Sequence, residues 1–290
     1  MSYSYEDLTR EMDLLKIEGY EVGTIGNSTM SRPTPYVFIG ESKSPCVFVF
    51  GAIHAREYIT APLTLALIRY YNRKTGIYIV PMANPDGVEL CQNNGADLGR
   101  TPYEFLFEAN NRNTDFSLWK ANDRAVDLNV NFNADWGTGI QNVNYPAPAN
   151  YIGEYPDSEI ETRNLIRFTN KINPALIISY HTKGELIYYG YKNYPDYYEY
   201  AKRFSDLTGY FLLKSDNSAG GYKDWFVKNY RRLGMTFEVG NEIFSYPFPL
   251  TEFPTIVEQN KGVYNLAGDV AEELWTKNLW ISQFPWLNKR

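Results

Sequence analysis

The chain has 290 residues, of which 44% are hydrophobic and 21% charged, values that fit a soluble globular protein with a substantial core. Its net charge of −6 and the lack of any run of lysine and arginine argue against nucleic acid as a general partner. No segment reaches the roughly 20 apolar residues of a membrane span, the N-terminal residues lack a secretion signal, and the two cysteines show no metal-type spacing, so we expect a cytoplasmic protein without a membrane partner.

The first third of the chain predicts a helix followed by strands. Residues 5–17 place apolar residues at helical spacing. Three apolar runs rich in β-branched and aromatic residues, 36–40, 46–54 and 76–84, are typical of buried strands. A helix-length pattern at 57–74 separates the last two. This strand–helix–strand unit predicts a mainly parallel sheet that is covered on both faces.

The rest of the chain continues the alternation after one long interruption. Residues from about 85 to 155 are rich in Asn, Asp, Gly and Pro and predict a long loop, which at this length is usually functional. Beyond it we expect, in order, a helix at 157–172, strands at 175–182 and 185–191, helices near 196–208 and 222–231, a strand at 235–240 and a last helix from Pro254 to about Lys277. With no linker or repeat, the sequence predicts one catalytic α/β domain, residues 1–290. Its mixed, largely parallel twisted sheet is flanked by helices on both faces.

Four polar groups stand at or just after the ends of predicted strands: His54, Glu57, His181 and Glu238. The two histidines are the only ones in the chain. Active sites of open α/β sheets lie at the carboxyl ends of strands, and two imidazoles plus one carboxylate form a known catalytic zinc shell. The fourth group could then act as a general base. The H-x-x-E pair is weak evidence alone, because a strand-end histidine and a first-turn acid are also ordinary structural features.

Five motifs carry a resemblance to a known family. In order, "GAIHARE", "PMANPDG", "VDLNVNF", "ISYHT" and "FEVG" resemble the motifs of the zinc carboxypeptidases over roughly residues 35–275. The resemblance implies the fold of that family and one bound zinc ion. It implies that His54, Glu57 and His181 are the zinc ligands and that Glu238 is the general base.

The same resemblance suggests further roles. Asp127 resembles the carboxylate that orients the first zinc-binding histidine, and Arg56 and Asn129 resemble residues that contact substrate. The family places an arginine just after a tryptophan to stabilise the oxyanion. Here Lys120 stands in that position, with Arg124 as the alternative cation four residues later.

Three departures from the family concern the substrate. Carboxypeptidases that trim C-termini read "DLNRN" or "DANRN" where this chain reads "DLNVN", so Val130 replaces the arginine that clamps the terminal carboxylate. An isopropyl group cannot replace a bidentate guanidinium. The usual tyrosine upstream of "DW" is missing, and Asp216 stands near its position. Lys223, at the position that sets side-chain preference, would suit an acidic leaving group, although a surface lysine at a helix start is the plain alternative.

Together with these three features, the segments "SYHTKGELIYYGY" and "YPDSEIETRNL" resemble the corresponding sequence of the γ-D-glutamyl–meso-diaminopimelate peptidases. That resemblance implies hydrolysis of the γ-D-glutamyl–meso-diaminopimelate amide bond in peptidoglycan stem peptides (muropeptides), and we expect a monomer. Two alternatives stay open. One is a conventional metallocarboxypeptidase or a zinc amidohydrolase acting on acylated amino acids, and the other is an inactive protein that binds wall peptides.

Overall fold

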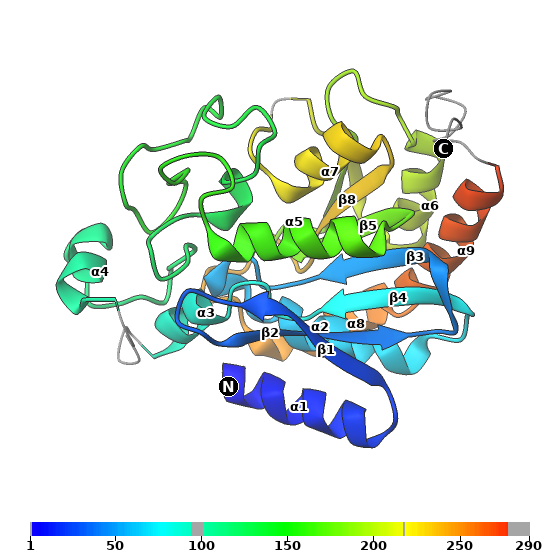
Figure 1. Ribbon diagram of the computed structural model, residues 1–290, viewed down its shortest axis with the longest axis horizontal. Helices are drawn as coiled ribbons and strands as arrows, with labels where there is room; N and C mark the ends of the chain where they lie inside the picture. Colours follow the sequence, from blue (N-terminus) through cyan, green and yellow to red (C-terminus); the bar gives the residue numbers. More distant parts are fainter. Residues whose placement is uncertain (1, 94–100, 217, 278–290) are drawn as a thin grey trace.

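The computed structural model describes residues 2–93, 101–216 and 218–277 (Figure 1). The strands within these ranges form one eight-stranded sheet in the order β1-β2-β4-β3-β5-β8-β6-β7. They are β1 (Glu21–Asn27), β2 (Pro33–Ile39), β3 (Ser42–Phe50), β4 (Thr75–Val80), β5 (Leu176–His181), β6 (Leu186–Tyr189), β7 (Phe211–Lys214) and β8 (Leu233–Glu238). The central neighbours β4, β3, β5 and β8 pair in parallel, whereas β1–β2, β2–β4 and β6–β8 are antiparallel. The predicted mixed sheet with a parallel centre is confirmed.

Helices cover both faces of this sheet. They are α1 (Tyr5–Ile17), α2 (Thr60–Ala66), α3 (Pro85–Gln92), α4 (Tyr103–Ala109), α5 (Ile160–Ile172), α6 (Tyr198–Thr208), α7 (Tyr222–Tyr230), α8 (Phe253–Asn260) and α9 (Val263–Thr276). Helix α5 lies across the front of the sheet, and α2 and α8 lie behind it (Figure 1). No described helix is long and apolar enough to cross a bilayer.

Strand β3 shows how one sheet supports two cores. Its side chains alternate between the faces, as the two-residue repeat of a strand requires. Val47 and Val49 enter the larger core with residues of α1, α2, α6, α8 and α9. Phe48 and Phe50 enter the second core, which α5 and α7 close. Because residues 46–50 of β3 are buried on both faces, the sequence there is a continuous apolar run rather than an alternating one.

Local signals set several boundaries. Helix α1 begins where Ser4 and Asp7 form a reciprocal capping box, and its range agrees with the predicted 5–17. Helix α5 ends at Asn173, which has a left-handed φ of 49°. Helix α6 ends in the same way at Gly209, with a φ of 78°.

The structure corrects four details of the predicted elements. The predicted loop at 85–155 contains α3 and α4, and α3 begins with an Asn84 side-chain cap and Pro85 in its first turn. The predicted last helix is divided into α8 and α9. Strands β1 and β7 were not predicted, because both lie at sheet edges with exposed or partly exposed side chains, and the longest apolar run within them is the three residues 211–213 of β7. Of the predicted domain, residues 1, 94–100, 217 and 278–290 lie outside the described residues.

Candidate metal centre

The candidate site lies at the carboxyl ends of three neighbouring parallel strands. His181 ends β5 and Glu238 ends β8, and the two residues are paired in register. His54 follows the end of β3, and the short 3-10 turn η1 (Ala55–Glu57) carries Glu57. The chain can turn here because Ala52 adopts a left-handed φ of 46° and its N–H donates to the Thr60 hydroxyl at 2.7 Å. Topology therefore gathers residues that are far apart in the sequence.

Three donor atoms from these segments converge on one point. His54 Nδ1 and His181 Nδ1 are 3.1 Å apart, and they lie 3.0 Å and 3.1 Å from the two oxygens of Glu57. All three side chains are buried. Ligand atoms on a tetrahedral zinc ion lie about 3.3 Å apart, given zinc–ligand distances of about 2.0–2.1 Å. The donor set and its spacing fit a zinc ion with an open coordination position.

Asp127 orients His54 from behind. Its carboxylate is fully buried, with Oδ1 3.3 Å from His54 Nε2 and Oδ2 3.0 Å from Lys120 Nζ. Oδ1 also accepts the Asn129 N–H, and Oδ2 accepts the Asn150 N–H. Burial acts to raise the pKa of Asp127, but Lys120 and His54 outweigh it and hold that pKa well below its usual range. An ionised Asp127 favours the proton on Nε2, which leaves Nδ1 of His54 free to bind a metal.

The pKa values of the two glutamates of the site are shifted in opposite directions. Burial acts to raise the pKa of Glu57, but His54 and His181 more than offset it, so this carboxyl stays ionised. Burial raises the pKa of Glu238 to about 7, and the charge of Glu57 adds to this effect while His181 opposes it. Two carboxyls with pKa values pushed apart are typical of a ligand beside a general base.

A cavity of about 700 Å³ opens beside Glu238. Five residues predicted for catalysis or substrate binding line it: Lys120, Asn129, Val130, Lys223 and Glu238. The lining also includes polar residues that were not predicted, among them Tyr188, Lys214 and Thr236, and it includes Asp216. Tyr188 and Thr236 are register partners on β6 and β8. The sequence indicates that each residue lies on one face of a strand, because side chains alternate between the two faces. It does not indicate which face borders the cavity, because that depends on the order of the strands in the sheet.

Comparison with known proteins agrees with this geometry. Residues 7–262 match the model of the zinc carboxypeptidase family. The chain belongs to the zinc carboxypeptidase family.

Individual relatives cover most of this zinc carboxypeptidase chain. It is 34% identical over 265 residues to "Gamma-D-glutamyl-L-diamino acid endopeptidase 1" of Lysinibacillus sphaericus, an alignment that covers 84% of this chain and 66% of that relative. The chain thus spans just under two thirds of that relative's length. Among solved structures, bovine thrombin-activatable fibrinolysis inhibitor aligns with a TM-score of 0.77 at 18% identity, covering 94% of this chain and 98% of the other. The murein-tripeptide amidase MpaA of Escherichia coli O157 aligns with a TM-score of 0.56 at 19% identity, covering 85% and 91%. Both structures share the fold.

A close backbone contact fixes the cavity wall of this family member at the position of the absent clamp. Gly220 has a φ of 77°, and a Cβ atom there would lie 2.4 Å from the carbonyl oxygen of Val130. Glycine is therefore required at position 220. Asn129 also contributes to the contact, because its Oδ1 accepts the N–H of Tyr222 at the start of α7. The loop that carries Val130 is thus locked against the segment that leads to Lys223.

Lys223 differs from a surface lysine at a helix start. Its side chain is only 6% exposed, and Nζ donates to the Gly190 carbonyl at 2.6 Å and to Asp224 Oδ1 at 2.5 Å. The cation is therefore held by neighbouring groups at the cavity wall. Whether it contacts substrate stays a prediction.

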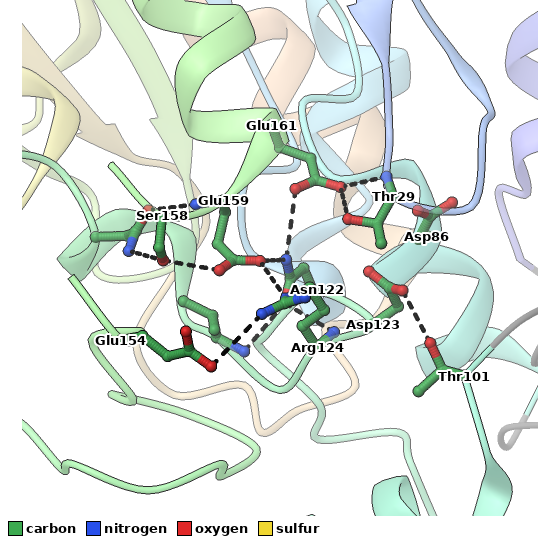
Figure 2. A network of polar contacts seen from close by, with 12 residues as sticks. Thr29, Asp86, Thr101, Asn122, Asp123, Arg124, Glu154, Ser158, Glu159 and Glu161 are labelled. Carbon is green, nitrogen blue, oxygen red and sulfur yellow. Dashed lines mark hydrogen bonds and ion pairs between the residues drawn. The ribbon is translucent and has the colours of Figure 1, made fainter. Parts of the chain in front are cut away.

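Two predicted cations are not among the described residues that line the cavity beside Glu238. The Arg124 side chain is half exposed and contacts Glu159 at 3.3 Å and Glu154 at 3.9 Å (Figure 2). It borders a second cavity. Arg124 as the oxyanion-stabilising cation stays a prediction beside Lys120, and of the two it is Lys120 that lines the cavity with Glu238. Arg56 stacks on the Tyr246 ring at 4.1 Å and is not among the described lining residues. Its role in substrate contact stays a prediction.

Proposed function

We propose that this chain hydrolyses the γ-D-glutamyl–diaminopimelate amide bond of peptidoglycan stem peptides. Family membership supports a zinc-dependent peptidase, and the printed name of the 34% identical relative supports a γ-D-glutamyl–diamino acid bond. The observation that carries the choice of substrate is the cavity wall. Val130 lines it, and no arginine is among the described residues that do so.

The wall offers a different set of charges from a carboxylate clamp. Lys120, Lys214 and Lys223 supply cations, and Asp216 and Asp224 supply anions. A stem-peptide diamino acid carries carboxylates and an amine, so both signs of charge have a counterpart on it. This complementarity supports a substrate that is zwitterionic on the leaving side.

The chain's own residues account for the proton transfers. Zinc in the His54–Glu57–His181 shell would acidify a water molecule and polarise the scissile carbonyl. Glu238, with its raised pKa, accepts the proton from the attacking water and returns it to the departing amine. Lys120 lines the cavity and places positive charge near the carbonyl oxygen, where negative charge develops. Asp127 holds both Lys120 and His54 in place.

Mass spectrometry of the tripeptide L-Ala–γ-D-Glu–meso-diaminopimelate, incubated with zinc-loaded protein, tests the proposal. Release of free diaminopimelate is expected from the wild type and not from Glu238→Gln. A peptide with an ordinary free C-terminal residue serves as the comparison substrate. If only that peptide is cleaved, the conventional carboxypeptidase alternative holds instead. If neither is cleaved by folded, zinc-bound protein, the proposal is overturned, and the amidohydrolase and binding-protein alternatives are left.

The compartment and the oligomeric state are part of the same proposal. The cytoplasmic location of the protein and its monomeric state both stay predictions. Fractionation of cells and light scattering of the purified chain would test them.

A further inference from the structure

A second group of buried acids lies outside the zinc site. Asp86 belongs to α3, Asp123 to the segment between Lys120 and Asp127, and Glu161 to the first turn of α5 (Figure 2). Their exposed fractions are 2%, 1% and 1%. Each offers one carboxylate oxygen, and the three oxygens lie within 4.8 Å of one another. We propose that Asp86, Asp123 and Glu161 form a second metal site, which binds one Ca²⁺-like divalent cation.

Among the described residues, the hydrogen bonds of the group leave one carboxylate oxygen without a partner. Asp86 accepts from Arg32 at 2.9 Å and from the Met30 N–H at 2.8 Å. Glu161 Oε1 accepts from the Thr29 N–H and hydroxyl, and its Oε2 lies 3.4 Å from Asn122 Nδ2.

Asp123 is the member of the group whose hydrogen bonds are incomplete. Its Oδ2 accepts from the Thr101 hydroxyl at 3.0 Å, but its Oδ1 is buried with no hydrogen-bond partner among the described residues. In Figure 2 the oxygen without a dashed line points toward Thr29 and Glu161. Leaving a buried carboxylate oxygen unpaired costs free energy, so such an atom indicates a missing partner. The free oxygen points into the group, which is where a cation would lie.

The charges of the group favour the same ligand. Among the described residues, three carboxyls face one guanidinium, that of Arg32, which pairs with Asp86. When all three carboxyls are ionised, two negative charges are in excess of this guanidinium, and one divalent cation would balance them. Burial raises the pKa of Asp123 to about 6, and the charge of Asp86 adds to this; burial, with the charge of Asp123, raises the pKa of Glu161 to about 7. Near neutral pH both carboxyls could exchange a proton for a cation at little cost.

The donor atoms indicate which cation. All three are carboxylate oxygens, the ligands of hard ions, whereas the zinc site has two imidazoles. Mg²⁺ demands near-ideal octahedral geometry and usually keeps several waters, whereas Ca²⁺ accepts carboxylate oxygens in a flexible arrangement. Three buried carboxylates contributed by separate segments therefore suit Ca²⁺ better. The hydroxyls of Thr29 and Thr101, together with water, are available to complete its coordination.

A route to the group and a consequence of binding are also present. A cavity of about 420 Å³ is lined by Thr29 and Thr101, the two residues whose hydroxyls donate to the group. Asp123 lies three residues after Lys120 and four before Asp127. A cation on Asp123 would therefore fix the segment that positions the oxyanion cation and the partner of His54.

Calcium counting on the intact chain tests the proposal. The protein is freed of metals with a chelating resin, restored with one equivalent of zinc and dialysed against Ca²⁺. We expect one calcium per chain in addition to one zinc, and a melting temperature about 5 °C higher when Ca²⁺ is at about 100 times its Kd. No retained calcium and no shift of the melting temperature would overturn the proposal.

Matched variants locate the ion. Asp123→Asn and Glu161→Gln should each lose the calcium-dependent rise while keeping zinc. Glu154→Gln is the control, because this exposed residue borders the same cavity without belonging to the group; it should retain the full rise. Calcium retained equally by Asp123→Asn and Glu161→Gln would place the ion elsewhere and overturn the proposal.

Discussion

The zinc site and the acidic group are alike in form and differ in their surroundings. In each site three side chains offer one ligand atom apiece, and these atoms lie within 4.8 Å of one another. All six side chains are buried. The zinc site borders the larger cavity and has a general base, Glu238, beside it. In the described part of the chain, the acidic group has hydroxyl and amide donors, Arg32 and a smaller cavity beside it.

This difference indicates which of the two sites can carry out the reaction and which can only stabilise the fold. An electrophilic ion needs an open position, a base and room for a substrate, and only the His54–Glu57–His181 site has all three. The acidic group can hold an ion but has no described base aimed at bound water. We therefore assign reaction to the first site and stabilisation of the segment between Lys120 and Asp127 to the second.

Replacing the base should produce the largest effect. Glu238→Gln removes proton transfer but keeps a similar shape, so turnover should fall by about 10²- to 10⁴-fold. Zinc content should remain one per chain, because Glu238 is not part of the ligand triad. Steady-state kinetics with metal analysis checks both. Near-normal turnover would remove Glu238 from the mechanism.

The residue behind His54 offers the next test. Asp127→Asn takes the charge from the partner of His54 Nε2 and of Lys120, so zinc affinity should fall by about 10- to 100-fold. Competition with a chromogenic chelator measures this loss. Calcium retention by the acidic group should be unchanged. A parallel loss of both metals would mean that the variant had disturbed the fold rather than the orientation of one imidazole.

Stability against pH distinguishes an acidic group that holds protons from one that holds an ion. The pKa values of Asp123 and Glu161, about 6 and 7, are above the ordinary values near 4. The folded chain thus binds protons that the unfolded chain has released. Their stabilising contribution is complete below about pH 4 and is lost as the pH rises through 6 to 7. In calcium-free buffer with constant zinc, the free energy of unfolding should fall by about 4 kcal/mol between pH 5 and pH 8.

Calcium and Asp123→Asn should each reduce that slope, the first by occupying the carboxylates and the second by removing one of them. Urea titrations at both pH values measure the effect. An unchanged slope in Asp123→Asn would assign the pH dependence to other groups.

The structure brings the three predicted zinc ligands together, and the sequence could indicate them because they stand at or just after the ends of continuous apolar runs. The central strands β3, β5 and β8 were found for the same reason, and their parallel pairing brought His54, His181 and Glu238 together. The acidic group could not be predicted. Its members come from a helix start, a loop and another helix start, where single acids are ordinary, and only the three-dimensional packing removes them from water. The contacts of Arg124 could not be predicted for a related reason, since the direction of a loop side chain is set by the neighbours it meets, here Glu159 and Glu154.

The smallest expected effect concerns the cavity wall. Val130→Arg would place a guanidinium in the wall beside Glu238, where a terminal carboxylate could accept two hydrogen bonds. The backbone there should stay in place, because Gly220 packs against the Val130 carbonyl rather than its side chain. We expect KM for peptides with an ordinary free C-terminus to fall a few-fold, with kcat nearly unchanged, since the new contact binds ground state and transition state alike. Val130→Leu is the control that changes size without charge. An equal fall in KM for both variants would attribute the effect to packing. No change in the arginine variant would mean that the missing guanidinium does not decide the substrate, and the lysines of the wall would then have to be tested in its place.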